Sequence, residues 1–336
     1  MVSSVLHFLV GTPLGVTILV VAGLFDLLFI GLVIARRTTK HIIEDLGLAW
    51  HGLMVWFVVP FFRLYFWGLQ QLGKIVITIN SPIPWEEKHL AFVGNHAMPK
   101  LQDTFLMPPI IFFSNISKIR NPIRYFPFTM ADETNFFSSK FFQWFVGTNF
   151  LISVDRTTVG IRRFKSVLKE CKKKVVGYSG ILIANIEGGR TQSAKKWIES
   201  PGGSKLGEPT VGVAILSLES NIPIVPYWGR IVKVSCYRFD PDVLFWRLLE
   251  KIFSKQLRGV GFYEDRPKAT LVMVFLGLAE LLLNPEIRVI IDINHSAGVI
   301  RPMAGQENSR QLTERIAQTL LDLGDHQLNK IERSRK

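Results

Sequence analysis

The sequence predicts an α/β protein, with a mixed, largely parallel sheet flanked by helices and an N-terminal membrane-embedded helical segment. Three observations support this prediction. From residue 74 onward, short apolar runs of strand length alternate with stretches of helical spacing, a pattern typical of α/β domains. An apolar run of bilayer length precedes residue 36. A composition of 48% hydrophobic and 20% charged residues fits a water-exposed domain with a short membrane-embedded part.

The N-terminal segment predicts membrane attachment. Residues 14–35 carry a single charge, Asp26, and as a helix they would be about 33 Å long. Three basic residues follow between positions 36 and 40, whereas residues 1–13 contain no Lys or Arg. The positive-inside rule then places the rest of the chain on the cytoplasmic face of a membrane. Because a carboxylate is costly at mid-membrane, a shallow hairpin-like insertion is the alternative to a full span.

A second apolar and aromatic stretch covers residues 53–69, where Pro60 and Arg63 interrupt a full span. We interpret it as an interfacial or re-entrant helix, with a helix packed on the following domain as the alternative. The predicted division is therefore an N-terminal membrane-anchoring part at 1–73 and one domain at 74–336.

Within the domain, each predicted element rests on its periodicity. Continuous apolar runs, or apolar residues that alternate with polar ones, predict strands. Apolar residues three or four positions apart predict helices. The predicted strands are 74–79, 89–95, 147–156, 180–186, 222–228 and 288–293, and the predicted helices are 161–174, 211–219 and 309–323. The apolar stretch 268–283 is short for a span, so we expect a core or membrane-surface helix there.

The charge balance indicates the kind of partner. The formal net charge is +13 and the pI is about 9.8. Combined with a mean hydropathy of +0.24, this excess favours anionic lipids or phosphorylated molecules over nucleic acid. The two cysteines have no metal-binding spacing, which is consistent with a reducing cytosolic setting.

Two sequence blocks place ionisable residues after predicted strands. In GNHAMPKLQDTF (94–105), His96 ends a strand and Asp103 follows. A histidine oriented by a carboxylate is a suitable general base. In IEGGRTQS (186–193), a buried strand leads to Glu187 and Arg190 through a Gly-rich turn. Backbone N–H groups and a guanidinium together suit a phosphate.

Two further blocks complete the pattern: GTNFLISVDR (147–156), a strand that ends in Arg156, and NIPIVPYW (221–228), a strand bracketed by prolines. In their order, the four blocks resemble the glycerolipid acyltransferase superfamily, typified by the 1-acylglycerol-3-phosphate acyltransferases of phospholipid biosynthesis. That family has a His-x4-Asp block, a strand ending in Arg, an E-G-[TG]-R block and a V/I-P-V/I-V-P strand. This sequence departs from it by placing six residues between His96 and Asp103.

The resemblance implies transfer of a fatty acyl group from acyl-CoA or acyl carrier protein to the hydroxyl of a phosphate-bearing glycerolipid precursor. It implies that His96 is the base and that Asp103 orients it. It also implies a set of substrate-binding residues, with Arg156 and Arg190 on the phosphate: Asn95, Arg156, Glu187, Gly188, Gly189 and Arg190. No metal or bound cofactor is expected, and the partners are membrane lipids and the acyl donor.

Two alternatives stay open. In the first alternative, the protein is an acyltransferase whose acceptor is a lysophospholipid or a glycolipid. In the second alternative, the unusual His-to-Asp spacing marks a catalytically degenerate protein of the same fold that binds anionic lipid.

Overall fold

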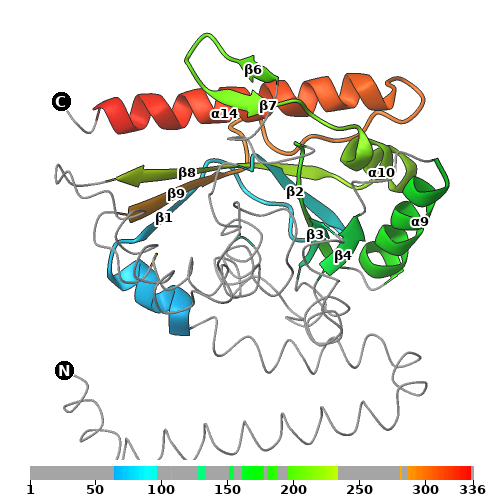
Figure 1. The fold of residues 1–336 in the computed structure, drawn as a ribbon, viewed down its shortest axis with the longest axis horizontal. Coiled ribbons are helices and arrows are strands. Elements are labelled where there is room, and N and C mark those ends of the chain that lie inside the picture. Colours follow the sequence, from blue (N-terminus) through cyan, green and yellow to red (C-terminus); the bar gives the residue numbers. More distant parts are fainter. Residues whose placement is uncertain are drawn as a thin grey trace, which may run out of the picture. The chain divides into compact units, whose positions relative to one another are not determined.

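The computed structural model describes residues 64–96, 107, 127–132, 151–154, 161–177, 180–187, 196–233, 281 and 287–333 (Figure 1). All of them belong to the compact unit Phe61–Lys336. The predicted anchor at residues 14–35 lies outside this range. In the part of the chain given above, no helix has the length and the apolar run needed to cross a bilayer.

The described residues form a seven-stranded sheet in the order β1-β9-β8-β2-β5-β3-β4. Only the β8–β9 pair is antiparallel, and the other neighbours are parallel. The α/β class with a mixed, largely parallel sheet is therefore confirmed. The strands are β1 Ile75–Ile79, β2 Leu90–Gly94, β3 Phe128–Asp132, β4 Leu151–Val154, β5 Ile181–Asn185, β8 Ile224–Lys233 and β9 Ile287–Ile293.

Three predicted helices are present. Helix α9 (Ile161–Cys171) continues into the π-helical turn η3 (Lys172–Val176), and α10 spans Gly212–Ser220. The terminal helix α14 (Ser309–Arg333) extends well past the predicted end at residue 323. Gly324 lies inside this helix, at a position where a Cβ atom would overlap the Trp228 ring and the Ser204 hydroxyl.

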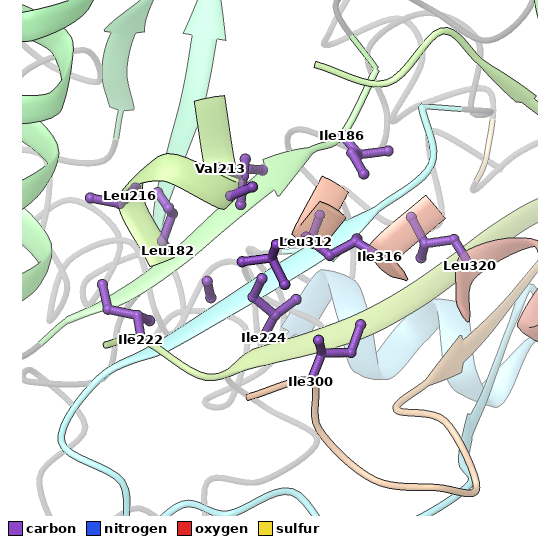
Figure 2. Packing of buried hydrophobic residues seen from close by; sticks show 14 of the residues in the cluster. Leu182, Ile186, Val213, Leu216, Ile222, Ile224, Ile300, Leu312, Ile316 and Leu320 are labelled. Carbon is purple, nitrogen blue, oxygen red and sulfur yellow. The ribbon is translucent and has the colours of Figure 1, made fainter. Parts of the chain in front are cut away.

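These helices share one hydrophobic core with the sheet (Figure 2). Every residue of β2 is buried, as expected for a central strand covered on both faces. The labelled core residues come from β5, α10, β8, α14 and the segments beside them: Leu182, Ile186, Val213, Leu216, Ile222, Ile224, Ile300, Leu312, Ile316 and Leu320.

Strand β8 runs through Pro226 and beyond the predicted end at residue 228. A proline inside a central strand removes a ladder donor. Here the antiparallel pairing with β9 begins only at Tyr227, opposite Ile293. The Pro226 carbonyl still accepts a hydrogen bond from the Asn294 N–H at 2.7 Å. Pro226 thus lies just beyond the end of the β8–β9 ladder, where its missing N–H group does not interrupt the pairing.

A two-stranded hairpin, β6 (Trp197–Glu199) and β7 (Lys205–Gly207), was not predicted. Its turn is bonded to α14 through Asp325. The Ser200 hydroxyl and the Ser204 N–H donate to Oδ1 at 2.6 and 3.1 Å, and the Gly202 N–H donates to Oδ2 at 3.1 Å. A Cβ atom at Gly202 would overlap this carboxylate, so the close approach requires glycine.

Residues 64–71, the described end of the predicted interfacial segment, are helical. Phe66 and Leu69 are buried, whereas Leu64 and Trp67 are 68% and 57% exposed. The described part of this helix therefore buries Phe66 and Leu69 and exposes the apolar side chains of Leu64 and Trp67.

Candidate functional site

The first and third sequence blocks meet at one edge of the sheet. Strands β2 and β5 are parallel neighbours, with Gly94 opposite Asn185. The ladder continues one step further, where the Ile186 N–H donates to the Gly94 carbonyl at 3.0 Å. Since parallel strands end at the same edge, His96 and Glu187 leave the sheet side by side. The carboxyl ends of neighbouring parallel strands are a common location for binding sites.

The fourth block contributes Tyr227 from β8, on the other side of β2. A Cβ atom at Gly94 would overlap the Tyr227 ring, so the ring crosses β2 only because position 94 is a glycine. The Tyr227 hydroxyl donates to Asn185 Oδ1 at 2.8 Å. This fully buried tyrosine therefore joins the three strands on which the site is built.

Asn95 extends the β2–β8 pairing with its side chain. Its Nδ2 donates to the Gly229 carbonyl at 3.0 Å, and its Oδ1 accepts from the Gly229 N–H at 2.8 Å. The amide thus imitates a peptide group and holds the backbone just before His96. Both amide atoms contact backbone; the predicted contact of Asn95 with substrate stays a prediction.

His96 and Glu187 are 5% and 4% exposed. Burying ionisable side chains costs free energy unless they have polar partners, and neither of these side chains is without an interaction. The backbone at Glu187 is fixed by a bridge to Pro209. Thr210 also donates to the Ile186 carbonyl, from its N–H at 2.8 Å and its hydroxyl at 3.0 Å. Two potential acid–base groups are therefore held on rigid backbone at one sheet edge.

Strand β4 runs in the same direction as β5 and β2, because β3 is parallel to both β4 and β5. It ends at Val154, two residues before Arg156. The backbone direction therefore leads the second block toward the edge that carries His96. The remaining candidate residues lie outside the described part of the chain: Asp103, Arg156, Gly188, Gly189 and Arg190.

Three residues of the site were not singled out from the sequence: Asn185, Tyr227 and Gly229. The sequence contains one indication of the close contact at Gly94. A glycine inside a buried strand often marks a place where another group comes close to the backbone, and Gly94 lies in such a strand. Which side chain approaches depends on the order β8-β2-β5, which local pattern does not specify.

No protein-family model matches this chain, and a search of curated proteins finds no match. The functional argument accordingly depends on the residues of the site and on their placement.

Proposed function

We propose that this protein is a membrane-bound O-acyltransferase that transfers a fatty acyl group from an acyl thioester to the hydroxyl of a phosphate-bearing glycerolipid precursor, such as 1-acylglycerol-3-phosphate. One observation carries the proposal. The blocks that contain His96 and Glu187, far apart in the sequence, follow adjacent, in-register parallel strands. This placement supports the proposal, because it brings the two blocks to one edge of the sheet.

In the proposed reaction, His96 removes the proton from the acceptor hydroxyl as its oxygen attacks the thioester carbonyl. The tetrahedral intermediate collapses with cleavage of the C–S bond, and the imidazolium returns the proton to the leaving thiolate. The buried setting of His96 supports this role, since exclusion of water limits hydrolysis of the thioester. The paired hydrogen bonds of Asn95 with Gly229 hold the backbone that carries the imidazole.

The acceptor phosphate is assigned to Arg156 and Arg190, with the N–H groups around Gly188 and Gly189 as further donors. Asp103 is assigned to the second nitrogen of the His96 imidazole. Glu187, buried at the end of β5, shapes the acceptor side of the site. No bound metal or cofactor takes part in this proposal, in which the acyl donor is a co-substrate.

The membrane supplies the acceptor. We assign residues 1–73 to membrane attachment and place the α/β domain on the cytoplasmic face, where the net charge of +13 favours contact with anionic lipid.

A panel of acceptors tests the proposal. The full-length chain in detergent micelles is incubated with a labelled acyl thioester and, in separate reactions, with 1-acylglycerol-3-phosphate, a lysophospholipid without a terminal phosphate and a glycolipid. We expect label in the product of the phosphate-bearing acceptor. If label appears only in the product of the lysophospholipid or of the glycolipid, the acceptor is of that class and not a phosphate-bearing precursor. If no acceptor is labelled and the protein still binds anionic vesicles, it is a catalytically degenerate lipid-binding protein.

A further inference from the structure

Strand β1 lies at one end of the strand order, so one of its two sides faces no other strand among the described residues. On the inner side, β1 pairs with β9 through its even-numbered residues. The Lys74 carbonyl accepts a hydrogen bond from the Val289 N–H at 2.8 Å, and the Asn80 N–H donates to the Ile293 carbonyl at 3.0 Å. Because the peptide groups of successive residues point to opposite sides of a strand, the odd-numbered residues direct their N–H and C=O groups outward.

The outward peptide groups belong to Ile75, Ile77 and Ile79. Within the part of the chain that the structure describes, these groups form no hydrogen bond. A free sheet edge of this kind is a template for pairing with another strand.

The side chains of β1 do not protect this edge. Exposed edge strands usually carry a charged side chain, a proline or a bulge that prevents further pairing. Strand β1 reads IVITI, without charge or proline, and its pairing with β9 is regular. Val76 is 36% exposed and Ile79 is 41% exposed. These two residues lie on opposite faces of the strand, so apolar surface is uncovered on both faces at the edge.

A lipid surface would not satisfy this edge, because acyl chains offer no hydrogen bonds to the outward peptide groups. A strand does, and β1 of a second copy is complementary to it. In an antiparallel pair centred on Ile77, each Ile77 faces its counterpart and each Ile75 faces Ile79 of the other copy. All of the outward groups then meet, which gives about six backbone hydrogen bonds.

The side chains in this register also match. Isoleucine faces isoleucine on one face of the joined sheet, and Val76 faces Thr78 on the other. The nearest charged residue along the chain, Lys74, would face Asn80, so no like charges stand directly opposite each other.

We infer that the protein forms a symmetric dimer in which the β1 strands of two copies pair antiparallel and join the two seven-stranded sheets into one. The same surface serves both subunits, as in other two-fold dimers. The axis is perpendicular to the sheet, so α14, which packs against β8 (Figure 1), lies on the same side in both copies. The opposite face of both sheets then points in one direction, which allows both copies to bind one membrane.

A cysteine at the symmetry centre tests this register in the full-length protein in detergent micelles. Facing Cα atoms of a hydrogen-bonded antiparallel pair are about 5.5 Å apart, which a disulfide spans. Ile77→Cys should therefore form a disulfide-linked dimer on mild oxidation. The parent, which has Cys171 and Cys236, gives the background.

Ile79→Cys is the matched control. Ile79 is more exposed than Ile77, but the two copies of residue 79 would lie about 14 Å apart along the paired strands. We expect roughly tenfold less cross-linking than for Ile77→Cys, because a disulfide does not bridge Cα atoms more than about 7 Å apart.

Sedimentation in detergent measures the dimer without oxidation. The edge variant, Val76→Lys with Ile79→Lys, carries lysines like a protected edge strand. Its control, Val211→Lys with Met303→Lys, adds the same charge at two positions elsewhere that are each 42% exposed. We expect the parent and the control to be dimers, and the Kd of the dimer to be at least roughly tenfold higher for the edge variant. Circular dichroism should be the same for all three, since the changed side chains are exposed.

A parent protein that stays monomeric at the highest soluble concentration would overturn the inference. So would a dimer whose Kd is unchanged in the edge variant, or equal cross-linking of Ile77→Cys and Ile79→Cys. None of these measurements uses an acyl donor or an acceptor, so the dimer can fail while the proposed function stands, and the reverse.

Discussion

The Tyr227 ring occupies the space that a side chain at position 94 would need. Gly94→Ala should therefore force the ring away from β2 and break its hydrogen bond to Asn185. Overpacking of this kind costs about 1–3 kcal/mol, which urea unfolding of the variant would measure. Ala91→Gly, in the same buried strand, removes a methyl group instead of adding one and serves as the comparison. An unfolding free energy equal to that of the parent would show that the ring does not require glycine.

Burial of Asp292 on β9 should make the stability of the protein depend on pH. This residue is buried, and neither carboxylate oxygen has a hydrogen-bond partner in good geometry among the described residues. Burial raises the pKa of the Asp292 carboxyl, and nearby Lys330, Thr78, His326 and Gln327 offset this rise only in part. A pKa that is higher in the folded state means that ionisation of this group opposes folding.

The sign of the pH effect follows from this shift. The destabilisation by Asp292 is absent below the unfolded pKa of 3.8, grows as the pH rises toward the folded pKa, and is complete above it. Asp292→Asn should therefore be more stable than the parent at pH 8, with a difference that vanishes near pH 3. Thermal unfolding at several pH values would measure this, and a variant less stable than the parent at pH 8 would disprove it.

At the scale of elements, the β6–β7 hairpin depends on one carboxylate of α14. Burial raises the pKa of Asp325, but hydrogen bonds from Ser200, Ser204 and Gly202 outweigh it, so the pKa is lowered overall. The stabilisation is therefore present above the unfolded pKa of 3.8 and is lost as the pH falls through the lower folded value.

Asp325→Asn should release this hairpin at neutral pH. Amide hydrogen exchange over residues 196–207 should become faster, because the turn loses its charged acceptor. Asp322→Asn is the control, since Asp322 is exposed on the same helix and accepts a bond from Gln318. If both variants exchange alike, Asp325 does not hold the hairpin.

The elements also show what the sequence could and could not reveal. Strands β2 and β5 were predicted because their apolar runs are continuous, as in buried parallel strands. The β6–β7 hairpin gave no such signal: β6 has three residues, all of them exposed, and its position depends on Asp325, more than a hundred residues away in the chain. Likewise, the residues at the end of β2 were predicted as a site, but the contact of Tyr227 with Gly94 required the strand order.

For the whole molecule, membrane attachment remains a prediction with a direct test. Deleting residues 1–40 removes the apolar run and its basic flank. We expect weaker attachment, with part of the protein still sedimenting with membranes, because residues 53–69 and the basic surface are retained. Flotation of the deletion variant on anionic vesicles would measure this. Complete release would show that residues 53–69 do not contact the membrane.

The central claim is that His96 is the base of an acyl transfer. His96→Ala is compared with His326→Ala, which alters an exposed histidine on α14, in a single-turnover assay with labelled acyl thioester and 1-acylglycerol-3-phosphate. We predict a rate loss of about 10²–10⁴ for His96→Ala, with unchanged folding and membrane attachment, and a parent-like rate for His326→Ala. A rate for His96→Ala within about threefold of the parent, far short of a general-base contribution, would contradict the account.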